Sequence, residues 1–264
     1  MRKRIISIAI LLVATLVATA SEFWLEPNKF HYAVGEEMKL DFREGEAFTG
    51  EYWDMTKNKA ELLQWYSTAG MKDMIKAVKP TKWSNVIMKF TGEGTQMLVM
   101  RSNAAFREWG GNHFNTYLEE QESGEILELR KKTGSSTDSV KENFTRFAKV
   151  LVQVGERRDE TFKKKTGLRL EIMPTKNPYT LTTGDYLQCQ ILFDGRALPH
   201  ALVKVWSRLN DTTFLQNIYS EKDGTIAFPI STKGVWMVSA VKMIRSEKPP
   251  AEWHSLWGSL VFGI

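Results

Sequence analysis

The chain has 264 residues, of which 42% are apolar and 25% are charged, so its composition is that of a folded globular protein and excludes a disordered tail. Its formal charge of +5 taken alone hints at an acidic partner. The single cysteine, Cys189, excludes an internal disulfide framework and a cysteine-based zinc site.

Residues 1–20 have the features of a secretory signal peptide. A basic stretch at 2–4 precedes an apolar run at 5–17 and an A-x-A cleavage site at 18–20. The run is shorter than the ~20 residues that span a bilayer, so we expect cleavage before Ser21 and a periplasmic or secreted protein without a transmembrane segment. Removing three of the 36 basic residues leaves 33 against 31 acidic ones, a charge of +2. We therefore expect no nucleic-acid partner.

Residues 21–155 are predicted to form a β-sandwich with a helical insertion. Strand pairs are expected at 30–42 and 86–100, joined by glycine-containing turns. Helices are expected within about 113–154. The last of them rests on apolar residues at three- and four-residue spacings and on a capping box at Ser139. The apolar residues of that helix are Val140, Phe144, Phe147, Leu151 and Val154.

Residues 156–167 are polar, charged and flanked by glycine, which predicts a linker. Residues 168–264 alternate apolar and polar side chains almost throughout, which predicts a second β-sandwich. Asp194-Gly195 and Asp223-Gly224 separate such runs and are typical of hairpin turns. The fold class is therefore mostly β, with two sandwich domains.

No catalytic motif stands out, because G-x-S-x-G, H-E-x-x-H and a glycine-rich phosphate loop are all absent from the sequence. The four histidines, His31, His113, His200 and His254, match no metal-site spacing. We expect no enzyme activity and assign no cofactor. His31 and His254 are the residues to inspect for a transition metal.

Nine tryptophans are many for this length. Exposed tryptophans on a sandwich would indicate a glycan-binding surface, whereas Trp206 and Trp236 lie in apolar strands and are expected to pack between sheets. Cys189 alternates with core residues and is expected to be a small buried side chain.

Several segments together resemble a family of bacterial periplasmic proteins grouped as a domain of unknown function and often labelled nickel-uptake or cobalt-transport related. The segments are SEFWLEPNKF, MLVMRSN, TYLEEQESGEILELRKK, FTRFAKVLVQVG, GLRLEIMPTKNPYTLTTGDYLQCQILFDGRALPHALVKVW, DGTIAFPISTKGVWMVSAVKM and EWHSLWGSLVF. The resemblance covers nearly the whole mature chain and implies immunoglobulin-like or prealbumin-like sandwiches.

Two positions depart from that family. Many relatives carry histidine where this chain has Ser21 and Lys242, and their histidines would be natural metal ligands. Their replacement here weakens the case for metal binding, although His254 could be a relocated ligand.

These observations favour an exported, non-catalytic binding or accessory protein, associated with nickel or cobalt uptake and partnered by a membrane uptake system or receptor. Two alternatives stay open. One is a glycan-binding module that uses exposed tryptophans, and the other is a hydrolase with a site between the two domains.

Overall fold

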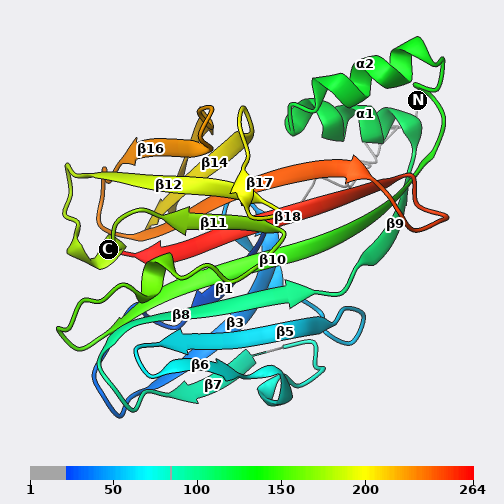
Figure 1. Ribbon diagram of the computed structural model, residues 1–264. Coiled ribbons are helices and arrows are strands. Elements are labelled where there is room, and N and C mark those ends of the chain that lie inside the picture. The colour runs from blue at the N-terminus through cyan, green and yellow to red at the C-terminus, as the bar shows by residue number, and fades with distance from the viewer. Residues whose placement is uncertain (1–21, 84) are drawn as a thin grey trace, which may run out of the picture.

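The computed structural model describes residues 22–83 and 85–264, so the predicted signal peptide at 1–20 lies outside the described residues. The described part is mostly β, as predicted, with three sheets and one pair of helices (Figure 1). The N-terminal sheet contains β1 (Glu22–Pro27), β3 (Glu37–Glu46), β4 (Thr49–Tyr52) and β7 (Asn85–Lys89). The central sheet contains β2 (His31–Tyr32), β5 (Ala60–Ser67), β6 (Gly70–Asp73), β8 (Gly94–Ser102), β9 (Ala105–Trp109), β10 (Val140–Val154), β14 (Leu202–Leu209), β15 (Thr212–Tyr219), β17 (Val235–Arg245) and β18 (Trp253–Gly263). The C-terminal sheet contains β11 (Leu170–Pro174), β12 (Tyr186–Phe193), β13 (Arg196–Ala197) and β16 (Thr225–Pro229). The helical pair is α1 (Gly111–Glu120) and α2 (Gly124–Lys132), and single 3₁₀ turns span Ile75–Ala77, Thr161–Lys163 and Pro178–Thr180.

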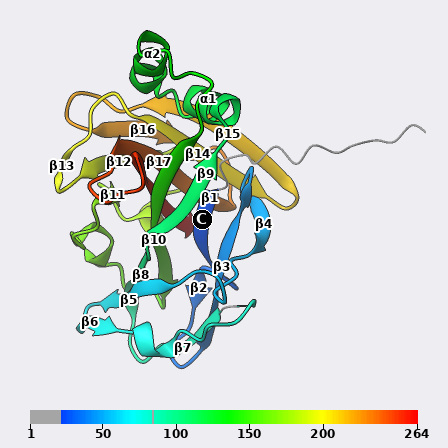
Figure 2. The ribbon, with the colours of Figure 1, turned by 90° about the vertical axis from the view of Figure 1, so that its right-hand side faces the viewer.

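The central sheet is the middle of three layers. Its strand order is β15-β14-β17-β18-β10-β8-β5-β6, and β2 and β9 also pair with β10. Along β10, Val150 and Val152 face the core under the N-terminal sheet, whereas Phe147 and Leu151 face the core under the C-terminal sheet. Figure 2 shows the two smaller sheets on opposite sides of this layer. The two predicted sandwiches therefore share the central sheet, and the boundaries expected at 155 and 168 stay predictions.

The predicted helix over 140–154 is wrong, because these residues form the 15-residue strand β10. One or two shorter helices were expected before it, and two are present, α1 and α2. β10 is buried on both faces over its second half, so its apolar residues are not confined to alternate positions. Apolar residues on both faces of a strand also occur at three- and four-residue spacings, which produced the helical pattern.

The helical pair covers the same face of the central sheet as the N-terminal sheet does. On β18, Val261 packs in the core under the N-terminal sheet, while Trp253 and Trp257 pack against α1. These three positions differ by even numbers and therefore point to one face. The N-terminal sheet and the helical pair thus lie side by side on that face, with a boundary between them.

The segment 156–167, predicted as a linker, is fixed to the rest of the molecule. Thr161 and Phe162 are buried, and the Asp159 carboxylate accepts hydrogen bonds from the backbone N–H of Thr95 at 2.9 Å and of Thr161 at 2.8 Å. The Asn177 side chain donates to the Asp159 carbonyl at 3.1 Å. These contacts connect the segment to β8 and to the turn after β11.

Candidate functional site

A groove with a free volume of about 820 Å³ runs between the helical pair and the edge of the central sheet. We call it the helix–sheet groove. Three segments that are far apart in the sequence line it, namely the α1–α2 turn at 121–126, the loop at 198–202 and the end of β17 at 241–245. Its volume is within the usual range of small-molecule sites, roughly 300–1,000 Å³.

The two walls of the groove carry opposite charges. The α1–α2 turn supplies the exposed carboxylates of Glu122 and Glu125, of which Glu122 accepts a hydrogen bond from the Tyr219 hydroxyl, whereas β17 supplies Arg245. The Arg245 guanidinium lies over the Trp253 ring, 4.0 Å from its centre, and this contact holds it against the groove lining. The groove can therefore contact both an anionic and a cationic group of one ligand.

The groove is lined by apolar side chains between these charges. Met243 and Trp253 are buried at its base, and Ile126 and Leu202 are half-buried at its sides. A ligand that fills the groove would cover this apolar surface, which favours binding of a partly apolar molecule.

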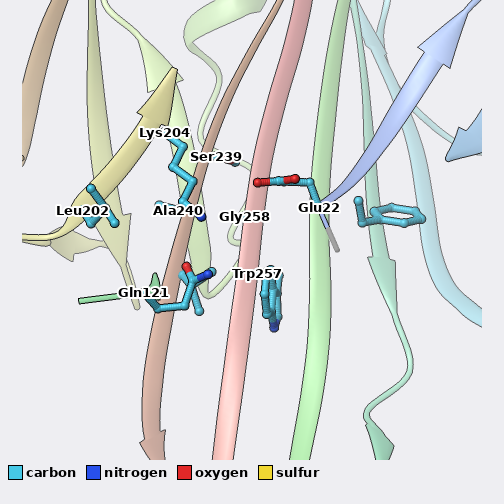
Figure 3. A pocket seen from close by; sticks show the side chains of 10 residues that line it. Glu22, Gln121, Leu202, Lys204, Ser239, Ala240, Trp257 and Gly258 are labelled. Carbon is cyan, nitrogen blue, oxygen red and sulfur yellow. The ribbon is translucent and has the colours of Figure 1, made fainter. Parts of the chain in front are cut away.

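A smaller pocket lies next to the groove, in the boundary between β1 and the C-terminal end of α1. It shares Gln121, Leu202 and Val241 with the groove, and its free volume of about 10 Å³ accommodates about one water molecule. Figure 3 shows Glu22 reaching over β18 from β1 and Lys204 extending toward it from β14.

Glu22 in this pocket is an unusual carboxylate. Its residue is 7% exposed, and burial raises its pKa to about 7, although the positive charge of Lys204 acts in the opposite direction. A carboxylic acid with this pKa changes its charge near neutral pH, so the charge of this end of the boundary depends on pH.

Stacked aromatic rings fix α1 onto the central sheet beside the groove. The Tyr117 ring stacks on Trp109 with centroids 5.0 Å apart and on Trp257 with centroids 5.9 Å apart. The Tyr117 hydroxyl donates to Ser255 Oγ at 3.1 Å. These contacts hold the acidic wall of the groove at a defined distance from β17.

An ion pair between a buried carboxylate and a half-buried guanidinium lies under the same aromatic rings. The Glu142 carboxylate is fully buried and accepts hydrogen bonds at 2.5 Å from Arg107 Nε and from Trp109 Nε1. The Arg107 guanidinium also packs against the rings of Trp109 at 4.2 Å and Phe144 at 4.8 Å. This cluster fixes the position of Trp109 and, through it, of α1.

The structure does not bring His31 and His254 together. His31 is in register with Gln153 at one end of β10, and His254 is in register with Asn143 near the other end. Ten residues of strand separate these two positions by about 33 Å. Among residues 22–83 and 85–264, no three His, Cys, Asp or Glu side chains are grouped to hold a metal ion.

Each of the two histidines has a local environment that disfavours its charged form. The His31 ring contacts Tyr179 edge-on at 5.1 Å. Burial lowers the pKa of His31, and the positive charge of Arg158 lowers it further. His254 Nε2 shares a hydrogen bond with Thr145 Oγ1 at 2.9 Å, and burial followed by the charge of Arg169 lowers its pKa. His113 is exposed on α1, and His200 lines the helix–sheet groove.

The tryptophans are mostly in the core. Trp206 and Trp236 are buried, as predicted, and so is Cys189. Trp65 is half-buried, and Trp83 has 67% of its surface exposed. Its ring contacts Tyr52 edge-on, with centroids 5.3 Å apart.

The sequence did not identify the helix–sheet groove. Glu122, Glu125 and Arg245 have no motif around them, and the topology of the central sheet brings them together. Of the residues that line the groove, the sequence pointed only to Lys242, where relatives were expected to carry histidine, and to His200, one of the four histidines. An acidic helix–helix turn opposite a basic strand end becomes a signal only when the fold is known.

The structure defines a layered, mostly β protein with a groove beneath a helical pair. The chain belongs to the family described as Domain of unknown function (DUF4198), whose model matches residues 18–243. That description assigns no function, and no curated protein matches the sequence. Within the described residues, none of the helices combines the length and apolar character needed to cross a membrane.

Two solved structures show a weak similarity to the chain. A tetra-tandem repeat from the extending region of a large adhesion protein is 11% identical, with a TM-score of 0.24, and the match covers 92% of this chain and 50% of that one. The three N-terminal domains of the bacteriophage RB49 Highly Immunogenic Outer Capsid protein (Hoc) are 10% identical, with a TM-score of 0.19 and coverages of 92% and 70%. The chain thus spans half the length of the adhesion protein structure. Scores this low do not define a common strand arrangement.

Proposed function

We propose that the protein is an exported, non-catalytic binding protein whose helix–sheet groove takes a small zwitterionic ligand, such as an amino acid or a short peptide. The observation that supports this most directly is the pairing of opposite charges across the groove. Glu122 and Glu125 would contact the ammonium group, and Arg245 would contact the carboxylate. The apolar base at Met243 would contact the rest of the ligand.

Isothermal titration calorimetry with free amino acids and with neutral, acidic and basic tripeptides tests this function. Leu202→Trp would fill the groove without removing a charge, and it is expected to weaken binding at least about tenfold. Leu209→Trp is the matched control, because Leu209 is exposed at the other end of the same strand. Absence of binding by every probe, or equal binding by the Leu202→Trp variant, would contradict the proposal.

Export is part of this proposal and rests on the sequence of residues 1–20. N-terminal sequencing of the protein recovered from the periplasm or medium of a producing bacterium is expected to begin at Ser21. A full-length chain retained in the cytoplasm would contradict export.

A role in nickel or cobalt uptake is the more specific form of the proposal, supported by the sequence resemblance alone. The described residues do not fit a resident metal ion. His31 and His254 are far apart, and no three His, Cys, Asp or Glu side chains are grouped to hold a metal among residues 22–83 and 85–264. Calorimetric titration with nickel, cobalt, copper and zinc tests it. Binding no tighter than that of the variant with all four histidines changed to alanine would reject it.

Glycan binding is a second candidate, favoured by Trp83. Its exposed indole, set against Tyr52, provides an apolar face of the kind that stacks on sugar rings. Cell-surface polysaccharide should then quench tryptophan fluorescence in the native protein and fail to do so in a Trp83→Ala variant. Equal quenching in both proteins would reject this candidate. The hydrolase alternative stays a prediction without a specific observation to favour it.

A further inference from the structure

The outer edge of the central sheet at β15 has unusual features for an exposed strand. β15 is the last strand on its side and pairs with β14 alone among the described residues. Its eight residues, TTFLQNIY, carry no charge. Of the eleven large apolar side chains exposed in the described part of the chain, four lie on the β14–β15 hairpin, namely Leu209, Phe214, Leu215 and Tyr219.

The opposite edge of the same sheet is protected. β6 has four residues, and two of them, Lys72 and Asp73, are charged. Short length and charge are the usual devices that prevent an edge strand from pairing with another chain. β15 has neither device, so its open edge is suited to accept a further strand.

We propose that β15 pairs with β15 of a second copy of this chain, in antiparallel orientation about a twofold axis, and that the two central sheets become continuous in the dimer. The proposal does not rest on the function proposed for the helix–sheet groove, and Tyr219 connects the two regions because its hydroxyl donates to the Glu122 carboxylate of the groove. A closed twofold arrangement uses both open edges and leaves none for further addition.

The backbone of β15 is consistent with this pairing. The N–H of Ser220 donates to the Ala201 carbonyl at 3.0 Å, so Ser220 bonds toward β14. Hydrogen-bonding direction alternates along an antiparallel strand, so Leu215, Asn217 and Tyr219 direct their backbone groups to the open edge. With the twofold axis at Gln216, the backbone N–H and C=O of Leu215 in each copy would form two hydrogen bonds with the backbone of Asn217 in the other.

The side chains are self-complementary in the same register. Phe214 would lie directly opposite Ile218 of the second copy, which is an aromatic–β-branched pair of the favourable kind. Thr213 would lie opposite Tyr219, and the two Gln216 amides would meet at the axis. A strand without charge also gives no electrostatic reason to select a basic or acidic peptide, which favours a second copy as the occupant.

Sedimentation equilibrium of the purified protein across the micromolar range tests the proposal. The native protein is expected to reach twice the mass of the chain, and Leu215→Lys is expected to raise the dissociation constant at least about tenfold by placing two positive charges across the axis. Asn217→Pro removes an outward N–H without altering charge and should weaken the dimer similarly. Met71→Lys, on the exposed β6 edge, is the control and should leave the dimer unchanged.

Hydrogen exchange identifies the interface. In the dimer, the amides of Leu215, Asn217 and Tyr219 should exchange more slowly than in the Leu215→Lys monomer. A native protein that is monomeric throughout, an open-ended polymer, or a dimer in which these amides exchange freely would overturn the proposal. Circular dichroism of each variant confirms that it is folded, and the two β15 variants act through different chemistry.

Discussion

Lys149 and Glu171 form a buried ion pair that connects the central sheet to the C-terminal sheet. Lys149 is 1% exposed on β10, Glu171 is 3% exposed on β11, and the lysine Nζ donates directly to the carboxylate. The carboxylate also accepts from the backbone N–H of Thr166 at 2.9 Å and from its hydroxyl at 2.8 Å. Burial lowers the pKa of Lys149, and the charge of Glu171 opposes that effect.

Removing one member of this pair should be strongly destabilising. Glu171→Gln would leave the Lys149 ammonium buried without a counter-charge, so we expect the free energy of unfolding to fall by about 3–5 kcal/mol. Urea denaturation followed by tryptophan fluorescence measures the change.

Two further variants separate the effect of charge burial from simple loss of a contact. The double variant Lys149→Met with Glu171→Leu removes both charges and should recover most of the lost stability. Glu128→Gln removes the exposed pair with Lys131 and should leave the free energy of unfolding nearly unchanged, because solvent screens such pairs. A double variant as unstable as Glu171→Gln would show that the pair itself, with its hydrogen bonds, stabilises the fold.

The local sequence predicted strands well where one face is buried and the other is exposed. β12 is one such strand, with Leu187, Cys189 and Ile191 buried and Gln188 exposed between them. The turn after it also follows the sequence, since Asp194 and Gly195 both have positive φ, at 47° and 74°, and join β12 to β13.

Prediction failed where the environment of a segment is set by distant parts of the chain. β10 has a sheet packed on each face, a fact that its own residues cannot reveal. Asp223-Gly224 has the same dipeptide as the β12–β13 hairpin, yet it leads from β15 to β16, which pairs with β12 in a different sheet. The groove was missed for the same reason, because its walls come from three separate segments, at 121–126, 198–202 and 241–245.

The stack of Tyr117 on Trp109 and Trp257 predicts that the helical pair can be loosened separately from the sheets. Tyr117→Ala removes the ring between the two indoles, and a truncation of this size in a core costs about 3–5 kcal/mol. Hydrogen exchange should accelerate in α1 and α2 while the amides of the N-terminal sheet change little. Leu129→Ala, at an exposed position on α2, should leave both regions unchanged, and a uniform acceleration in all sheets would contradict separate docking.

Cys189 should be chemically inert in the folded protein. It is fully buried in the core under the C-terminal sheet, and burial raises the pKa of its thiol, with the positive charge of Lys149 acting in the opposite direction. The reactive species is the thiolate, so a thiol reagent such as Ellman's reagent should label the native protein far more slowly than the urea-unfolded chain. Rapid labelling under native conditions would show that this core opens readily.

Glu22 predicts a specific dependence of stability on pH. Its folded-state pKa of about 7 is above the ordinary value of 4.5, mainly because the group is buried. Between these two values the folded protein retains a proton that the unfolded chain has released, so stability from this group is present at low pH and is lost as pH rises toward 7. Glu22→Gln is always neutral and should escape that loss.

Relative to the native protein, the Glu22→Gln variant should therefore gain stability between about pH 4 and pH 8, by up to roughly 3 kcal/mol. Glu36 provides a control of opposite sign, because hydrogen bonds from Lys29 and from the Ala33 N–H lower its pKa. Glu36→Gln should show no gain at the higher pH, since an exposed carboxylate with a lowered pKa contributes stability there and loses it only as pH falls. Urea unfolding at about pH 4 and about pH 8 measures the free energy of unfolding of both variants and of the native protein. A Glu22→Gln variant whose stability relative to the native protein does not change with pH would show that Glu22 titrates alike in the folded and unfolded states.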